Sequence, residues 1–183
     1  MYDIECLREW TDGSRHHKEV DMCLPQIAEG SEHRVFLDAA NARVFKATRP
    51  GLFGESYYIQ DNKVFQRNCR PIEYVARLLL WRSVFGSAPE AHGITALGQI
   101  VSSHEFITGD LPSQYEVDRF SEDAGFVPIK QKYWLWKKVY RPHRVSSPRL
   151  IIELGDARDE NFVKTPSGIV PIDIRLWGIH SHR

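Results

Sequence analysis

The sequence predicts an α+β fold, because its strand-like and helix-like segments do not alternate in the regular order of a parallel sheet. Three features indicate this: a hairpin pattern within residues 34–48, a strong helix over residues 71–85, and several strands with turn signals near the C-terminus. The 183 residues suit one domain, or one domain built from two small lobes. Apolar residues make up 42% of the chain, which is enough to form a core.

The N-terminal part holds one helix signal and one hairpin signal. Residues 3–10 predict a short helix with its apolar residues on one side, and residues 11–24 are polar and irregular. Residues 34–38 and 43–48 are rich in β-forming side chains and flank four turn residues. This pattern predicts an antiparallel hairpin with Asn41 in its turn.

Two helices carry start and stop signals. The first, residues 71–85, opens with a proline and is stopped by Gly86. The spacing of its apolar residues predicts that one face packs in the core, formed by Ile72, Val75, Ala76 and Leu79. The second helix begins at Ser113, which forms a capping box with Glu116, and it ends at Gly125.

Further strands follow in the second half of the chain. Residues 98–107 predict a buried strand, and residues 132–139 and 149–154 predict two more. The last of these leads the chain directly to Asp156. Beyond it, two short apolar stretches flank a turn signal at residues 165–168, which predicts a small hairpin.

The composition excludes several kinds of partner. Lysine plus arginine equals aspartate plus glutamate at 24 each, so the net charge gives no general reason to bind nucleic acid or an anionic membrane. No apolar stretch reaches the roughly 18 residues of a membrane span, and the first residues lack a signal-peptide core. The three cysteines are odd in number and widely spaced, which is typical of reduced thiols in the cytosol. We therefore expect a cytoplasmic protein with no membrane or nucleic-acid partner.

Three oxygen-bearing residues stand out beside the strands near the C-terminus. Asn161 follows Asp156 by five positions in a loop, and Asp173 comes after the small hairpin. An amide oxygen and a carboxylate are ligands that Mg²⁺ accepts together with substrate phosphates. A second carboxylate can orient or deprotonate a hydroxyl nucleophile. This spacing fits the template of phosphoryl transfer in kinases.

On these residues the chain resembles the protein-kinase-like fold. It is closer to aminoglycoside phosphotransferases and to the polyvalent protein kinase domains of mobile-element proteins than to eukaryotic kinases. The segments that carry the resemblance are "GDARDEN", "PIDIR" and "GDLPSQYEVDRFSEDAGF". The resemblance covers roughly residues 28–175. It implies a small two-lobed fold: an N-terminal extension over residues 1–27, a nucleotide-binding half with an antiparallel sheet, one helix and a hinge over 28–108, and a reduced C-terminal lobe over 109–183.

The resemblance assigns roles in the C-terminal lobe. Asp156 would be the catalytic-loop aspartate, and Arg158 would occupy the place of a basic residue that faces the transferred phosphate. Asn161 and Asp173 would hold the metal ion in the metal-binding hairpin.

The resemblance also assigns nucleotide contacts in the N-terminal half. Gly30 would lie in a phosphate-covering turn, and Lys46, in the middle of a strand, would touch the α- and β-phosphates. Glu73 in the first turn of the following helix would fix that lysine. Backbone groups from Glu105 to Ile107 would meet the adenine edge at the hinge.

The function implied is ATP-dependent phosphotransfer with ATP and Mg²⁺, onto a protein or small-molecule acceptor that the sequence does not identify. Two departures bear on this expectation: Asp173 is followed by Ile174 and Arg175 in place of Phe-Gly, and only ten residues follow Asp173. From these departures we expect no activation segment and no further helices for a peptide acceptor. The alternative is a nucleotide- or protein-binding module without turnover, a pseudokinase.

Each of these residues also has a structural interpretation. Asp156 can be a turn former, and Lys46 can be a solvated strand lysine. Glu73 can be an acid that the helix dipole favours, and Arg158 can be a surface arginine.

Two further interpretations concern apolar surroundings. Asp173 lies within an apolar run, so we expect a buried carboxylate with a partner, either a metal ion or a cation such as Arg175 or Arg158. Trp134 and Trp136 lie two residues apart on one strand face, where they pack against the core or offer a stacking surface for a base.

Overall fold

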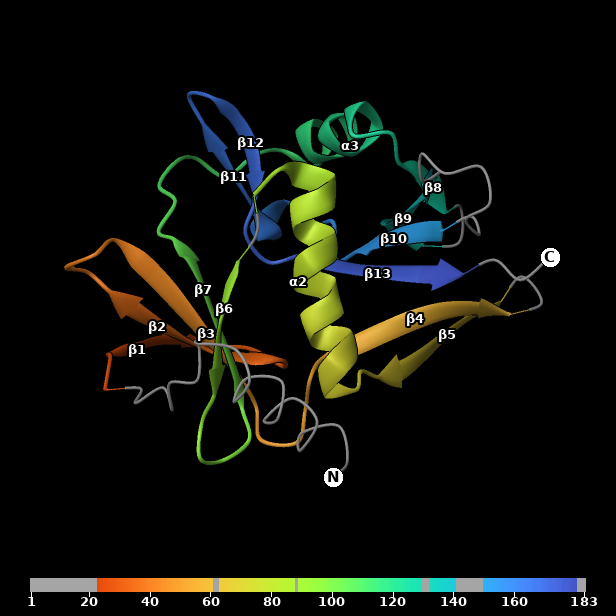
Figure 1. Ribbon diagram of the computed structural model, residues 1–183. Coiled ribbons are helices and arrows are strands. Elements are labelled where there is room, and N and C mark those ends of the chain that lie inside the picture. The colour runs from red at the N-terminus through yellow and green to blue at the C-terminus, as the bar shows by residue number, and fades with distance from the viewer. Residues whose placement is uncertain (1–22, 61–62, 88, 130–131, 141–149, 181–183) are drawn as a thin grey trace. The chain divides into compact units, whose positions relative to one another are not determined.

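The structure is a computed structural model, and it describes residues 23–60, 63–87, 89–129, 132–140 and 150–180. The expected helix over residues 3–10 lies outside the described residues. The chain divides into two compact units, Met1–Phe106 and Ile107–Arg183. Both units combine antiparallel strands with a single described helix, so the predicted α+β class is confirmed (Figure 1).

The first unit is built on a five-stranded antiparallel sheet. Its strand order is β1-β2-β3-β7-β6, with β1 at Gln26–Glu29, β2 at His33–Asp38, β3 at Arg43–Thr48, β6 at Glu90–Ile94 and β7 at Ile100–Glu105. The predicted hairpin is the β2–β3 pair, in continuous register along both strands. In its turn, the backbone and side-chain nitrogens of Asn41 donate to the Asp38 carboxylate at 3.1 and 2.8 Å. These bonds replace the ladder hydrogen bonds that the chain gives up on reversing direction.

Helix α2 (Pro71–Phe85) has the predicted bounds, and Gly86 ends it in the left-handed conformation with φ of +76°. The predicted buried face is wrong, since Ile72 is 47% and Leu79 is 68% exposed. The residues that α2 buries are Pro71, Tyr74, Arg77, Leu78 and Trp81. Both faces of the helix are apolar, and the face with the larger aromatic rings removes more surface from water.

The Tyr74 hydroxyl on the buried face of α2 has partners in the sheet. The Tyr74 hydroxyl lies 3.0 Å from Nε2 of His33 and 3.3 Å from the hydroxyl of Ser102. Because these polar atoms are hydrogen-bonded, their burial carries little penalty. The same face packs on a cluster of buried residues that comprises Phe53, Cys69, Tyr74, Leu78, Ile94 and Ile100.

Several strands of the first unit were not predicted. The pair β4 (Glu55–Gln60) and β5 (Lys63–Asn68) forms a separate two-stranded sheet. Strand β6 has a register shift beside Gly93, and its sequence "EAHGI" is poor in β-forming residues. It is a strand because of its pairing with β7, and no local signal shows that pairing.

The second unit contains a four-stranded antiparallel sheet, one helix and a small hairpin. The sheet order is β13-β10-β9-β8, with β8 at Val127–Ile129, β9 at Lys132–Tyr140, β10 at Leu150–Gly155 and β13 at Arg175–His180. The hairpin is β11 (Phe162–Thr165) with β12 (Gly168–Pro171), as the turn signal predicts. Strands β9 and β10 are also confirmed, and Trp136 on β9 is buried in the core.

Helix α3 (Gln114–Asp123) begins with the predicted capping box between Ser113 and Glu116. The helix ends at Asp123 and its cap is Ala124, one residue before the predicted cap Gly125, which has φ of +84°. The ammonium group of Lys164 on β11 lies 2.6 Å from the Glu116 carboxylate, which joins the hairpin to the start of the helix. No helix in the described part of the chain is long and apolar enough to cross a membrane.

Candidate functional site

Asp156 stands where strand β10 ends and the chain turns sharply. Gly155 precedes it, and a Cβ atom at that position would lie 2.6 Å from the ring of Trp177, so only glycine fits. Asp156 itself has a left-handed φ of +59°, which is uncommon for a residue other than glycine. The next amide, of Ala157, donates to the carbonyl of Trp134 at 3.2 Å and fixes the new chain direction. Strained backbone of this kind is often found at functional positions.

Asn161 holds the loop closed from its far end. Its side chain is 8% exposed, and its Nδ2 atom donates to the carbonyl oxygen of Asp156 at 2.9 Å. Its backbone amide donates to the carbonyl of Arg158 at 2.9 Å, within the short 3₁₀-helix Asp159–Asn161. Because Nδ2 is used for the loop, Oδ1 is the end of the amide that can bind a cation.

The backbone of Asn161 also brings Asp173 to the same place. The carbonyl of Asn161 accepts from the amide of Ile172 at 2.8 Å and from the amide of Asp173 at 3.3 Å. The three residues that the sequence singles out therefore lie together in the second unit. The expectation that Asp173 is buried is wrong, since its side chain is exposed. Asp173 lies in a bend after β12, and Ile174 takes the buried position.

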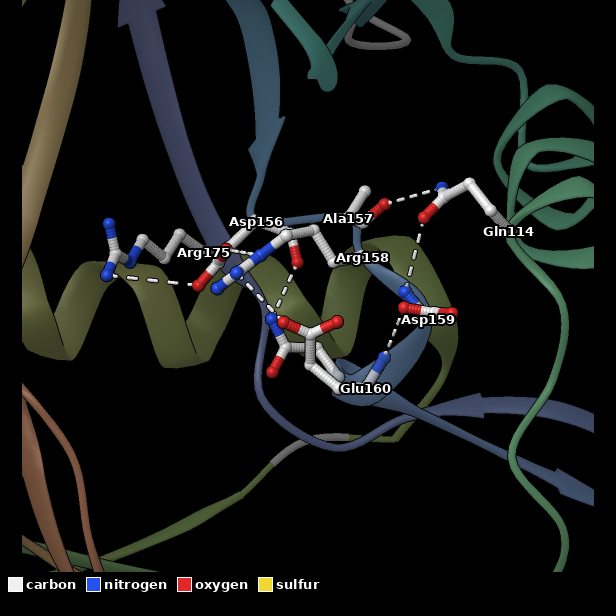
Figure 2. Close-up of polar contacts among 8 residues, drawn as sticks. Gln114, Asp156, Ala157, Arg158, Asp159, Glu160 and Arg175 are labelled. Atoms are coloured by element: carbon white, nitrogen blue, oxygen red, sulfur yellow. Dashed lines mark hydrogen bonds and ion pairs between the residues drawn. The ribbon is translucent and has the colours of Figure 1, made fainter.

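Two arginines contact the Asp156 carboxylate (Figure 2). Nε of Arg158 lies 2.7 Å from Oδ1, and Nη2 of Arg175 lies 3.8 Å from Oδ2. Arg158 also reaches Glu160 at 2.8 Å. The contact of Arg175 with Asp156 was not predicted. It lies there because Arg175 begins β13 directly opposite Gly155, and no local pattern predicts that pairing.

Gln114, the first residue of α3, holds the middle of the loop in place (Figure 2). Its Nε2 atom donates to the carbonyl of Ala157 at 3.0 Å, and its Oε1 atom accepts from the amide of Asp159 at 3.3 Å. This role of Gln114 could not be predicted, because a glutamine at a helix start carries no signal of a contact 43 residues away. The loop is therefore fixed by side chains from both of its flanks and from α3.

Gly30 and Lys46 lie in the first unit. Gly30 follows β1 in the turn before β2; its amide donates to the carbonyl of His33 at 2.8 Å, and its own carbonyl accepts from Nε of Arg49 at 2.9 Å. Lys46 is in the middle of β3, opposite Val35 on one side and Ser102 on the other. Cross-strand partners share a sheet face, and Ser102 meets Tyr74 of α2. Lys46 therefore belongs to the face that α2 covers.

Glu73 is engaged at the start of α2. Its two carboxylate oxygens accept from Arg67 at 2.6 and 2.9 Å, and one of them also accepts from the backbone amide of Arg70 at 2.8 Å. The Arg67 hydrogen bond is the main cause that lowers the pKa of Glu73. In the structure this carboxylate bonds to groups at the start of α2, which is the structural role considered for it, and not to Lys46. A bond to Lys46 would require it to leave Arg67.

A different ion pair links α2 to the sheet. The Glu32 carboxylate, next to the Gly30 turn, lies 3.2 Å from Nη2 of Arg77, and both side chains are buried. The other oxygen of Glu32 accepts from the amide of Glu55 at 3.1 Å. The guanidinium of Arg77 also lies 4.9 Å from the centre of the Tyr74 ring, a cation–π contact. The sequence carries no signal for this pair, which joins residues 45 positions apart.

The expected hinge residues lie where the two units meet along the chain. Strand β7 ends at Glu105, whose carbonyl accepts from Nδ1 of His104 at 2.8 Å. The amide of Phe106 donates to the carbonyl of Ala42 at 2.7 Å, which extends the pairing with the β2–β3 turn. Ile107 is the first residue of the second unit. Convergence of the first-unit residues with the Asp156 loop stays a prediction.

The side-chain oxygen atoms of Asn161 and Asp173 are of the kind that Mg²⁺ binds. Within the described residues, no group of three or more His, Cys, Asp or Glu side chains is placed to hold a metal ion. Mg²⁺ does not require one, because it commonly takes one or two protein ligands and completes its shell with water and phosphate oxygens. The Asn161 amide and the Asp173 carboxylate can supply that share. Comparison of the chain with protein-family models, with curated proteins and with solved structures gave no match.

Proposed function

We propose that the chain is an ATP-dependent phosphotransferase of the protein-kinase-like fold. One observation carries the proposal: Asn161 bonds through its side chain to Asp156 and through its carbonyl to the backbone of Asp173. An acid, an amide and a second acid from a loop and the far side of a hairpin are thereby held together. Phosphoryl transfer uses such a set, one group to position the nucleophile and two to hold the metal.

The roles follow from the position of each group. Asp156 would orient the acceptor hydroxyl and take its proton, and Arg158 would turn toward the transferred phosphate. Oδ1 of Asn161 and the exposed carboxylate of Asp173 would hold Mg²⁺. The metal ion would supply neutralisation of the charge on the phosphate oxygens.

The nucleotide contacts would come from the first unit. Lys46 would approach the α- and β-phosphates, and backbone groups of the Gly30 turn would cover them. Glu105 and Ile107 would contact adenine through their backbone groups.

The alternative is a nucleotide- or protein-binding module without turnover. The specific observation in its favour is the ion pair of Arg158 with Asp156 at 2.7 Å, with Arg175 at 3.8 Å from the other oxygen. A carboxylate whose oxygens are engaged by these guanidinium groups is not free to bond an acceptor hydroxyl. Catalysis requires that bound phosphate draw at least Arg158 away.

The proposal is tested by thermal melting with ATP, in the presence of MgCl₂ or of EDTA. Mg-ATP at 100 times its Kd should stabilise the chain by about 2.7 kcal/mol. Asp173→Ala should abolish the Mg²⁺-dependent part of this stabilisation. It should leave the free energy of unfolding without ligand within about 0.5 kcal/mol, because Asp173 is exposed.

Asp123→Ala is the matched control, since Asp123 is an exposed acid at the end of α3. It should retain the full Mg²⁺-dependent stabilisation. A wild-type chain that ATP does not stabilise, with or without Mg²⁺, would contradict the proposal and its nucleotide-binding alternative together.

A further inference from the structure

Glu153 is an acid buried in the middle of β10, three residues before Asp156, and it is 1% exposed. Its cross-strand neighbours are Trp177 on β13 and Lys137 on β9. The indole Nε1 atom of Trp177 donates to its Oε2 atom at 2.6 Å. Lys137 is exposed, and Arg175, the charged residue of β13 on the same face as Trp177, reaches Asp156. An acid so buried is costly, which calls for an explanation beyond packing.

Trp177 connects Glu153 to the start of the Asp156 loop. Its ring lies so close to Gly155 that a Cβ atom there would be 2.6 Å from one ring carbon and 2.9 Å from the next. The residue after Gly155 is Asp156, in its left-handed conformation. The Trp177 ring therefore limits where the backbone of Gly155 can lie, and Asp156 follows directly on that backbone.

We propose that Glu153 is a positioning residue for Asp156, acting through its hydrogen bond to Trp177 and the contact of Trp177 with Gly155. The effect of this positioning on turnover rests on the proposed function. The link between Glu153 and Trp177 itself does not, and it can be measured in the absence of any nucleotide.

The protonation state of Glu153 decides how firmly Trp177 is held. Burial raises the pKa of Glu153 to about 7, although the Trp177 hydrogen bond and the charge of Lys137 both act to lower it. The ionised carboxylate accepts a charge-assisted hydrogen bond, which is stronger than the bond to a neutral acid. The hold on Trp177 thus strengthens as the pH rises through about 7.

Tryptophan fluorescence tests the link directly, in a pH titration of the full chain that crosses pH 7. We expect a change in emission with a midpoint near pH 7, since a charge appears beside the indole nitrogen. The change should be lost in Glu153→Gln, which keeps the shape but does not ionise, and in Trp177→Phe, which lacks the donor. Trp134→Phe removes another indole of the same unit and should retain it. A transition that persists unchanged in Glu153→Gln would overturn the proposal.

The pH profile of turnover tests the positioning role. In the wild type, kcat should rise as the pH passes through about 7, and in Glu153→Gln this limb should be absent. At high pH, kcat of the variant should be lower by roughly 10-fold to 10²-fold, with KM for ATP unchanged, because a misplaced group slows chemistry more than binding. A variant with the wild-type profile would overturn the positioning role. If the wild type shows no turnover, the proposed function fails, and the fluorescence titration still decides the Glu153–Trp177 link.

Discussion

The Asp156 loop depends most on a single residue, Asn161. It is buried, its side chain closes the loop on the Asp156 carbonyl, and its own carbonyl holds the backbone of Ile172 and Asp173. A buried amide that makes these bonds is both a structural part of the loop and a source of one oxygen for a cation. These two roles can be separated by substitution.

Asn161→Ala should affect both stability and metal-dependent binding. It leaves the Asp156 carbonyl without its donor, which should lower the free energy of unfolding by about 1–3 kcal/mol in denaturant titrations. It should also remove the Mg²⁺-dependent part of the stabilisation by ATP. Asn41→Ala is the control: Asn41 makes comparable hydrogen bonds in an exposed turn. If Asn41→Ala abolished the Mg²⁺ effect equally, the role given to Asn161 would be wrong.

The buried pair of Glu32 and Arg77 is a second prediction at this scale. Arg77→Met should lower the free energy of unfolding by about 3–5 kcal/mol, because it leaves the Glu32 carboxylate buried without the guanidinium. Adding Glu32→Gln should recover part of that loss. Arg119→Met, which breaks an exposed pair with Glu122, should cost no more than about 1 kcal/mol. Equal costs for Arg77→Met and Arg119→Met in urea unfolding would refute the assignment.

At the scale of elements, local signals predicted bounds better than faces. Helix α2 has its predicted ends because proline and glycine act on the backbone beside them. Its buried face was predicted wrongly, because the partners that allow Tyr74 and Arg77 to be buried come from the distant residues His33, Ser102 and Glu32. Strand β13 was missed for a similar reason, since its pairing with β10 does not show in its sequence, which includes a glycine.

The contact between α3 and the β11–β12 hairpin gives a prediction on pH. The pKa of Glu116 is lowered to about 2. The hydrogen bond from the Lys164 ammonium is the largest cause, and the bonds from Ser113 come next. Because the pKa is depressed in the folded chain, this contact stabilises the fold fully at pH values above the ordinary pKa of 4.5. The stabilisation is lost as the pH falls toward about 2. Lys164→Gln should raise the pKa of Glu116 toward its ordinary value of 4.5, measured by an NMR titration of the carboxyl carbon. An unchanged pKa in this variant would show that Ser113 alone sets it.

At the scale of the whole molecule, the residues of the candidate site that come from neighbouring segments of the chain could be predicted from the sequence. Asp156, Asn161 and Asp173 come from one loop and one hairpin, so their spacing alone indicated that they meet. Gln114 and Arg175 could not be predicted, because they reach the loop through long-range packing and strand pairing. The relation of Lys46 to this loop depends on how the two units meet, which no local pattern encodes.

The most direct test of the proposed phosphotransfer is release of the γ-phosphate from Mg-ATP by the chain alone. In the proposed scheme Asp156 does not hold ATP; it positions the acceptor, which in this assay is water. Asp156→Asn should bind Mg-ATP as the wild type does and should lower the rate of release by roughly 10²–10⁴-fold, the range for losing a general base. A wild type that binds Mg-ATP but releases no phosphate, with Asp156→Asn behaving identically, would contradict catalysis and leave the binding module as the function.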